Sequence, residues 1–397
     1  MKGQILKLAA IANAPTRTII GLMSGTSLDG LDIALCQFEG TGYGTVCRLV
    51  DFITIPYTDA FRSRIKKIAF QPAAHLCELT VLNAEIGTYT AELVLQALKN
   101  WNFPASEVDI VASHGQTIFH APKSFHLQDS APNATLQIGD ADHIAVKTGI
   151  ITLSDFRQKH IAAGGEGAPL VFYGDSLLFT HRQENRILLN IGGISNFTWL
   201  PAGNSDLSAF STDVGPGNTM MDQYVSIQFP GKSFDQDAII ARSGSVNQQL
   251  LEALMTDPFF ELELPRTTGP EYFNLKYLED ALQKCGNPIC SPADIMATLC
   301  AFSAGTIVQT IRLLTGDIPY EVYVSGGGMH NPLLHQMISE GLNLDLHSTH
   351  ELGLNPDAKE AVLFALLANE CIAGQQQAFK SRPGIPAVTM GKISLPD

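Results

Sequence analysis

The sequence contains few charged side chains, and basic ones are the scarcer kind. Only 16 % of its 397 residues are Asp, Glu, Lys or Arg, whereas about 25 % is usual in soluble domains. Lys and Arg number 25 against 39 Asp and Glu, so the formal net charge is −14. Low charge combined with 45 % hydrophobic residues argues against intrinsic disorder. The acidic balance disfavours sequence-independent nucleic-acid binding, which depends on basic side chains neutralising phosphates.

The sequence also lacks the patterns of disulfide frameworks, zinc sites and membrane spans. Its seven cysteines are scattered and odd in number, without a Cys-x-x-Cys pair, which favours reduced thiols in the cytoplasm. The most apolar stretch, 295–310, is shorter than the roughly 20 residues that cross a bilayer. Lys7 interrupts the apolar centre that a signal peptide would need. We therefore expect a cytoplasmic protein with no membrane partner.

Three widespread catalytic or nucleotide-binding signatures are absent as well. The chain has no Gly-x-x-x-x-Gly-Lys-Ser/Thr loop, and its first predicted strand is not followed by Gly-x-Gly-x-x-Gly. It also has no Gly-x-Ser-x-Gly nucleophile elbow. The sequence therefore gives no support to a P-loop, a dinucleotide fingerprint or a serine-hydrolase triad.

What the sequence does contain is a strand–turn–strand pattern that occurs twice, over residues 18–38 and 186–200, each time around a glycine turn. Apolar residues three and four apart predict helices between and after these hairpins. The pattern predicts a layered α/β fold with two similar halves. The second hairpin is expected to begin with the strand 186–191. Further expected strands are 49–55, 108–113, 134–138, 150–153 and 321–325, and expected helices include 60–69, 73–100, 141–148, 220–228, 245–255, 292–314 and 359–371.

We expect two lobes in close contact, because no low-complexity linker separates them. The first is predicted over residues 1–140, with the C-terminal segment 375–397 returning to it, and the second over 141–374. Residues 1–17 are expected to form a loose arm. The active site is expected in the cleft between the lobes.

Several polar turns are candidates for chemistry. Backbone N–H groups in glycine-rich turns can converge on phosphate oxygens, and Gly326-Gly327-Gly328 would let a flat ring lie close to the backbone. Asp29 would suit such a turn if a divalent cation joined it to the phosphates. Ordinary β-turns use the same residue types, so that interpretation stays open.

Asp213 is the strongest candidate for an acid–base group. It precedes the rigid turn Gly215-Pro216-Gly217, where its carboxylate could take a proton from water or a hydroxyl. It could equally cap the helix that is predicted after it. Glu360, at the start of the last predicted helix, could bind a metal or could simply favour the helix dipole.

Arg157 and His114 are the other notable polar residues. Arg157 could hold an anionic or polyhydroxylated ligand through forked hydrogen bonds, or it could form an internal pair with Asp155. His114 lies in the polar turn 113–117, which is expected to end a strand. A lone histidine is more often structural than catalytic, so both roles stay open.

Taken in order, these segments resemble the anhydro-N-acetylmuramic acid kinase family. The resemblance covers nearly the whole chain, from residue 21 to about residue 370, and the first segment is highly specific. The matching segments are 21–30, 113–117, 136–139, 155–157, 164–169, 189–193, 213–218 and 326–328.

The resemblance implies a two-lobed actin-like ATPase fold, built from duplicated ribonuclease-H-like domains, in a cytoplasmic homodimer. The implied enzyme uses ATP, Mg²⁺ and water to convert 1,6-anhydro-N-acetylmuramic acid to N-acetylmuramic acid 6-phosphate in peptidoglycan recycling. Asp213 matches the catalytic base, and Glu360 matches an acid near the metal and water. Asp29 is a second possible metal ligand.

The remaining candidate residues divide into two groups on the same resemblance. The cofactor-binding group is Ser24, Gly25, Thr26, Ser27, Leu28, Asp29, Gly30, Leu31, Asn190, Gly192, Gly193, Gly326, Gly327 and Gly328. The substrate-binding group is His114, Gln116, Asp155, Arg157, Gly165, Glu166, Gly215, Pro216 and Asn218.

Departures from the family pattern include Asp235-Gln236-Asp237-Ala238, where Asp-Lys-Asp-Gly is usual, and three single positions. His160 stands where an aspartate is usual, Glu166 where glutamine is common, and Pro270 where arginine is usual. The first two lie in the segment expected to face the substrate. A kinase for a related anhydrosugar such as levoglucosan, and a non-catalytic actin-like ATP-binding protein, are therefore alternatives.

Overall fold

The computed structural model describes residues 1–25, 28–128, 130–168, 170–203, 205, 207–374 and 386–397. The chain forms two compact units, one of residues 1–178 and 357–397 and the other of residues 179–356. These boundaries differ from the expected ones, after residue 140 and before residue 375. The difference arises because strand β6 (Ile151–Ser154) and helix α14 (Lys359–Ala373) pack with the strands of the first unit.

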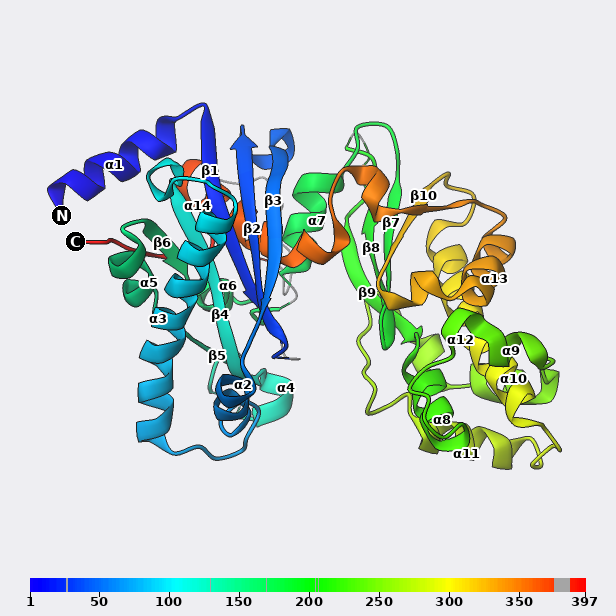
Figure 1. Ribbon diagram of the computed structural model, residues 1–397. Coiled ribbons are helices and arrows are strands. Elements are labelled where there is room, and N and C mark those ends of the chain that lie inside the picture. Colours follow the sequence, from blue (N-terminus) through cyan, green and yellow to red (C-terminus); the bar gives the residue numbers. More distant parts are fainter. Residues whose placement is uncertain (26–27, 129, 169, 204, 206, 375–385) are drawn as a thin grey trace. The chain divides into compact units, whose positions relative to one another are not determined.

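The first unit is built on a seven-stranded mixed sheet (Figure 1). Strands β1, β2 and β3 form an antiparallel meander, and β4 and β6 continue the sheet parallel to β1. Strand β12 pairs with β6 at one edge, and β5 pairs with β4. The bounds are β1 Thr16–Ser24, β2 Gly30–Glu39, β3 Val46–Pro56, β4 Ile110–Ala121, β5 Ala134–Ile138, β6 Ile151–Ser154 and β12 Lys392–Ser394.

Helices cover both faces of this sheet. Ile20 and Leu22 of β1 belong to the buried cluster that includes helix α3, whereas Gly21 between them lies against Ala361 of α14. Alternate residues of a strand face opposite sides, so α3 and α14 pack on opposite faces (Figure 1). The helices are α1 Lys2–Asn13, α2 Asp59–Lys66, α3 Leu76–Asn100, α4 Lys123–His126, α5 Ala141–Thr148, α6 Phe156–Ala162, α7 Val171–Phe179 and α14 Lys359–Ala373.

The second unit repeats the same strand plan in a five-stranded sheet. Strands β7, β8 and β9 form the antiparallel meander, while β10 and β11 extend it parallel to β7. The bounds are β7 Arg186–Ile191, β8 Ile194–Leu200, β9 Phe210–Pro216, β10 Glu321–Ser325 and β11 Leu346–Ser348. The order of β11-β10-β7-β8-β9 matches that of β6-β4-β1-β2-β3. The predicted duplicated α/β fold is confirmed by this shared topology.

Helix α12 forms the centre of the second unit's helical layer. Ser291 and Asp294 form a capping box at its start, and Pro292 occupies its first turn. It packs against strand β9 and four helices. The other helices are α8 Thr219–Gln228, α9 Ile239–Ser243, α10 Gln248–Met255, α11 Leu275–Lys284 and α13 Pro332–Leu342, and α12 spans Pro292–Thr315.

Helix α12 also corrects one expectation. The apolar stretch 295–310 is by itself too short to span a bilayer, but it lies within a helix of 24 residues. That helix is long and apolar enough to cross a membrane by length and composition. Most of its apolar window, 61 %, is buried inside the unit. This burial is typical of the core helix of a globular unit.

Most long elements agree with the sequence prediction, and the disagreements have physical reasons. The bounds of α5, β5, β7 and β10 are confirmed to the residue. The loose arm over residues 1–17 is wrong, because α1 forms there and β1 begins at Thr16. The polar segment 113–117 is not a turn, because it continues strand β4 and pairs partly with β5.

Candidate active site

In the first unit, Ser24 and Gln116 lie at the centre of a hydrogen-bonded network beside the first glycine turn. The Tyr57 hydroxyl donates to Ser24 Oγ (3.0 Å), and Ser24 Oγ donates to Gln116 Oε1 (2.7 Å). Gln116 Nε2 donates to the carbonyl of Gly25 (3.4 Å). All three side chains are buried. The network therefore fixes where strand β1 enters the turn.

The turn that follows is held from its far side. The carbonyl oxygen of Leu28, a residue with φ of +57°, accepts from Arg62 Nε (2.8 Å), and that of Asp29 accepts from the Tyr57 N–H (3.1 Å). Gly30 and Leu31 then begin β2. The predicted residues Thr26 and Ser27 lie outside the described residues.

In the same unit, the buried His114 pairs with the half-buried Arg157. Arg157 Nε donates to His114 Nε2 (3.0 Å), and Arg157 Nη1 donates to the carbonyl of Gly167 (2.7 Å). Since a guanidinium can only donate, His114 must accept through Nε2 and carry its proton on Nδ1, which bonds the Gly115 carbonyl (3.0 Å). Burial, and then the charge of Arg157, lower the pKa of His114 to about 3. His114 is therefore a neutral ring that orients Arg157.

His160 organises the glycine-rich loop 164–169. Its Nδ1 accepts the N–H of Gly167 (2.9 Å), and its ring meets Tyr173 edge-on. A Cβ at Gly165 would lie 2.1 Å from His160 Cε1, so only glycine fits there. Burial and the charge of Arg157 lower the pKa of His160 to about 4. His160 is thus a neutral hydrogen-bond acceptor within the loop, while Glu166 is exposed.

Asp155 does not form the internal pair that the sequence suggested. Its carboxylate instead makes an ion pair with Lys392 of β12, at the edge of the sheet. The residue has a left-handed backbone (φ +55°) just before α6. This placement separates the role of Asp155 from the pair of Arg157 and His114.

Acidic groups interact electrostatically near the start of α14. Burial, and then repulsion by Asp32, raise the pKa of Glu360, an effect that Arg157 and Lys359 oppose. The pKa of Asp32 is raised by burial and by Asp29 and Asp357, although Thr54 Oγ1 donates to its carboxylate. Within the described ranges, no group of three or more His, Cys, Asp or Glu is arranged to hold a metal. Asp32 was missed by the sequence analysis.

The second unit brings its three predicted glycine segments together. The N–H groups of Gly217 and Thr219 donate to the carbonyl of Gly193, and that of Asn218 donates to the carbonyl of Gly192 (2.8 Å). A Cβ at Gly217 would lie 2.3 Å from Gly192 O, which requires glycine there. Asn190 pairs with Ser325 in the sheet, so the turn after β7 and Gly326–Gly328 are neighbours.

Asp213 lies within β9, and its carboxylate is oriented by the loop that pairs with this strand. The N–H of Thr268 donates to Asp213 Oδ2 (2.9 Å), and the N–H of Asp213 donates to the Arg266 carbonyl (2.9 Å). Burial, and then repulsion by Glu271, raise the pKa of Asp213, while the Thr268 N–H opposes them. The alternative role as a helix cap is wrong, because α8 is preceded directly by Asn218.

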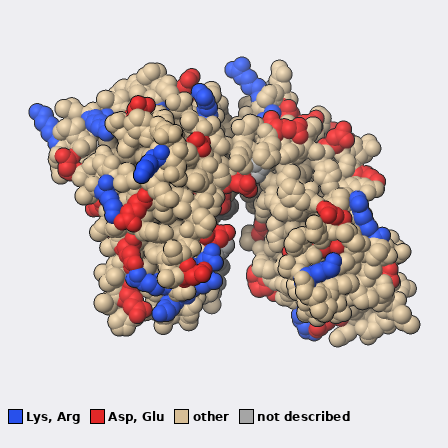
Figure 2. Space-filling view, in the orientation of Figure 1, with Lys and Arg blue, Asp and Glu red and all other residues tan. Residues whose placement is uncertain are grey.

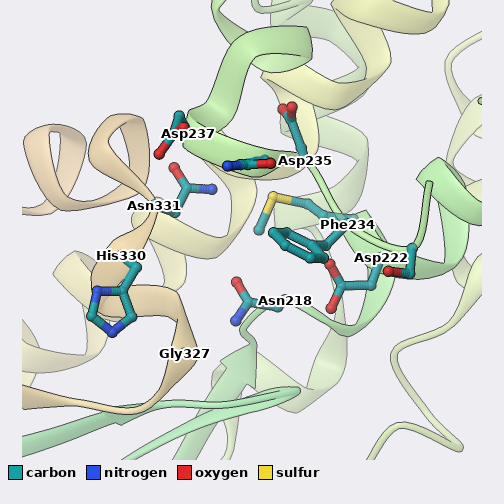
Figure 3. A pocket seen from close by; sticks show the side chains of 11 residues that line it. Asn218, Asp222, Phe234, Asp235, Asp237, Gly327, His330 and Asn331 are labelled. Atoms are coloured by element: carbon teal, nitrogen blue, oxygen red, sulfur yellow. The ribbon is translucent and has the colours of Figure 1, made fainter.

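Two cavities of the second unit lie beside these groups. One of about 450 Å³ is lined by Thr268, Glu271, Phe259 and Tyr272, among others, next to Asp213. The other, of about 750 Å³, is shown in Figure 3. The labelled residues that line it are Asn218, Asp222, Phe234, Asp235, Asp237, Gly327, His330 and Asn331.

The larger cavity contains residues that the sequence analysis did not single out. The ring of Phe234, 56 % exposed, faces Asn218 across the cavity (Figure 3). Burial raises the pKa of Asp222 to about 6. Asp235 is structural, because its two carboxylate oxygens accept the N–H groups of Ile240 and Ala241. The available signal in the sequence was a phenylalanine three residues after Gly231, next to polar and acidic residues.

Comparison with known proteins connects these sites to a family. Residues 17–394 match the anhydro-N-acetylmuramic acid kinase family. A protein of that name from Pseudoalteromonas atlantica is 50 % identical over 404 residues, and another from Pseudoalteromonas translucida is 48 % identical over 401. Both alignments cover 100 % of each chain. The chain belongs to the anhydro-N-acetylmuramic acid kinase family.

Kinase activity and use of ATP follow from membership of the anhydro-N-acetylmuramic acid kinase family. Among solved structures, the activator of the 2-hydroxyisocaproyl-CoA dehydratase from Clostridium difficile with bound ADPNP matches at a TM-score of 0.38 and 12 % identity. The match covers 89 % of this chain and 95 % of that one.

Proposed function

We propose that this chain transfers the γ-phosphate of ATP to O6 of 1,6-anhydro-N-acetylmuramic acid while water opens the anhydro bridge. The product would be N-acetylmuramic acid 6-phosphate, an intermediate of peptidoglycan recycling. The observation that carries the proposal is the carboxylate of Asp213, held by the Thr268 N–H beside an open cavity in a member of this family.

The reaction needs a base for water and no base for the sugar. Oxygen 6 carries no proton because it is locked in the anhydro bridge. The water oxygen bonds to carbon 1, the C1–O6 bond breaks, and O6 takes the γ-phosphate as ADP leaves. Asp213 takes the proton from water, and its raised pKa makes the carboxylate a stronger base than a solvated aspartate.

The nucleotide is proposed to bind in the second unit. The cavity beside Gly327 has room for a nucleoside, and Phe234 would stack against the base. The turn at Gly192-Gly193 would offer backbone N–H groups to the phosphates. The cofactor-binding role of the first unit's residues 24–31 stays a prediction from the resemblance. We place the cofactor-binding role of Gly326–Gly328 at this cavity, and extend it to Asn218.

A magnesium ion is proposed near the carboxylates of Asp29, Asp32 and Glu360, with ATP phosphate oxygens as further ligands, because the acids of the described ranges do not by themselves form a group arranged to hold a metal. Carboxylate oxygens are the ligands that Mg²⁺ prefers, and the mutual repulsion of these acids would be relieved by a cation. The ion would supply charge neutralisation for the transferred phosphoryl group.

The guanidinium of Arg157 is proposed to bind the carboxylate or the hydroxyl groups of the sugar. His114 and Gly167 hold the guanidinium in one orientation, which lowers the cost of ordering it on binding. The other proposed contacts with the sugar are Gln116, Gly165, Glu166, Gly215 and Pro216. Asp155, paired with Lys392, is proposed to act only by shaping this segment.

A cytoplasmic location and a homodimer complete the proposal. All seven cysteines are free thiols, which suits a reducing compartment. Acidic and basic side chains are interspersed on the face drawn in Figure 2. Light scattering of the purified protein tests the dimer, with about twice the 42.8 kDa chain mass expected.

An ATP-dependent assay with three sugars tests the proposed function. The purified chain is incubated separately with 1,6-anhydro-N-acetylmuramic acid, levoglucosan and N-acetylmuramic acid, and products are identified by mass. We expect product from the first sugar, heavier by one phosphoryl group (HPO₃) and one water. Activity on levoglucosan alone would contradict the proposed substrate, and no product from any sugar would contradict the kinase assignment.

A further inference from the structure

Arg266 is a buried cation in the loop that pairs with Asp213. Only 6 % of the residue's surface is exposed to solvent. Nη1 donates to the carbonyls of Phe259 and Phe260, both at 3.0 Å, and Nη2 donates to Thr310 Oγ1 (3.0 Å) and to the carbonyl of Val214 (3.4 Å). The guanidinium also lies 4.6 Å from the ring centre of Phe259. It therefore joins strand β9, helix α12 and the loop at 258–262.

The backbone of Arg266 also hydrogen-bonds to strand β9, through both its N–H and its carbonyl. Its N–H donates to Thr212 Oγ1 (3.0 Å), and its carbonyl accepts the N–H of Asp213 (2.9 Å). Two residues later, the N–H of Thr268 donates to Asp213 Oδ2. Side chain and backbone of Arg266 thus hold residues 212, 213 and 214, and lead into the amide that orients the Asp213 carboxylate.

The electrostatics of Arg266 are costly for a residue with only a packing role. The oxygens that accept its hydrogen bonds are neutral carbonyls and a hydroxyl, and burial lowers the pKa of Arg266. Its Nε is buried and has no hydrogen-bond partner among the described residues. An apolar side chain of similar volume would avoid the cost of burying a charge. What an apolar side chain could not supply is the set of donors that fixes three segments to one another.

We propose that Arg266 is a positioning residue for Asp213: by clamping the loop 259–268 to β9, it keeps the Thr268 N–H on the carboxylate. The catalytic consequence rests on the proposed function, in which Asp213 takes a proton from water. The clamp also shapes the smaller cavity, because Phe259 and Leu262 line that cavity and their carbonyls accept from Nη1.

The groups that surround Asp213 allow a clear pH prediction. Glu271, in the same loop, is the charged neighbour that opposes ionisation, and the Thr268 N–H favours it. From α12, the neutral side chain of Thr306 lies against Gly215, and Thr310 binds Arg266. Loss of the Thr268 contact would therefore raise the pKa of Asp213, and a carboxylate base would become active only at higher pH.

The test compares Arg266→Lys, Arg266→Gln and the milder Thr310→Val, which removes only one acceptor of the guanidinium. Arg312→Gln on the surface of α12 is the matched control. We expect a 10- to 100-fold lower kcat for Arg266→Gln with a less than twofold change in KM for ATP. The acidic limb of its kcat–pH profile should move upward, while Arg266→Lys recovers part of kcat. Thr310→Val should give smaller changes in the same direction.

Hydrogen exchange of the substrate-free protein supplies a readout that does not depend on the substrate. Faster exchange of the Thr268 amide in the Arg266 and Thr310 variants, but not in Arg312→Gln, is expected. Unchanged Thr268 exchange and an unchanged pH profile, with only a lower melting temperature, would overturn the positioning role. If the wild-type chain phosphorylates no anhydrosugar but the exchange result holds, the proposed function fails and the clamp stands.

Discussion

The two units share one strand order but hold their candidate residues in different ways. In the first unit, side chains hold side chains: Tyr57, Ser24 and Gln116 form one chain of hydrogen bonds, and His114 orients Arg157. In the second, backbone groups dominate, with the glycine turn after β7 bound to the start of α8. Duplicated topology therefore determines where the polar turns lie, while the local sequence determines the chemistry at each turn.

The acidic residues of the two units also differ in the chemistry that their surroundings favour. Asp32 and Glu360 of the first unit repel each other and suit a shared cation. Asp213 of the second unit is bound by one backbone N–H and lies beside a cavity, which suits proton transfer. The following variants test this division of roles, in order of decreasing effect on turnover.

Replacing the base should have the largest effect. Asp213→Asn keeps the shape of the side chain but cannot take a proton, so kcat should fall by about 10³-fold, within the range for loss of a general base. Binding of ATP, measured by calorimetry, should be unchanged. Asp345→Asn, an exposed residue of the same unit, is the control. Turnover of Asp213→Asn equal to that of the wild type would contradict the assignment of the base.

Replacing Arg157, whose guanidinium is held in one orientation, should have the next largest effect on turnover. Arg157→Lys loses the fork that bonds both His114 and Gly167. We expect kcat/KM for the anhydrosugar to fall by about 10- to 100-fold. Steady-state kinetics with each substrate varied should show little change in KM for ATP. Arg64→Lys, at an exposed ion pair with Glu85, is the control, and an equal loss in both variants would contradict this role.

Removing the exposed ring of Phe234 in the second unit should weaken the binding of the nucleotide but not that of the sugar. Phe234→Ala should raise KM for ATP by about tenfold, because a ring stacked on the base contributes roughly 1 kcal/mol beyond its buried area. The KM for the sugar should remain constant. Phe125→Ala, an exposed phenylalanine of the first unit, is the control. An unchanged KM for ATP would contradict stacking of the nucleotide's adenine ring on Phe234.

His160 should affect stability more than turnover. Its pKa of about 4 lies below the ordinary 6.5, so the unfolded chain binds a proton at a higher pH than the folded chain does. Stability from this residue is complete above about pH 6.5 and is lost as pH falls toward 4, by up to about 3 kcal/mol. Chemical denaturation of His160→Gln should show a weaker decline over that window. An unchanged decline would contradict the neutral, buried histidine.

The sequence predicted the strands better than it predicted the site. Strands such as 186–191 and 321–325 are short apolar runs bounded by turn residues, so local pattern sufficed. The polar segment 113–117 was misread because the pairing of β4 with β5 overrides its turn-like composition. Helix α1 was missed because its apolar residues do not form a regular stripe, and much of it is exposed.

The site was predictable where residues are glycine or acid in a recognisable turn, as at Gly192 and Asp213. It was not predictable where tertiary contacts give an ordinary residue its role. Arg266 is fifty-three positions from Asp213, and only the paired backbone reveals their contact. His160 likewise has a neutral state that depends on burial and on Arg157. Such roles follow from packing, which a single sequence does not display.

The most direct test of the central claim is to run the reaction in ¹⁸O-labelled water and to locate the label by fragment mass. The account predicts a sugar phosphate with one ¹⁸O at carbon 1 and none in its phosphate, formed at the same rate as ADP. Label in free phosphate without labelled sugar, or a phosphorylated sugar that has gained no water, would contradict coupled bridge opening and phosphoryl transfer.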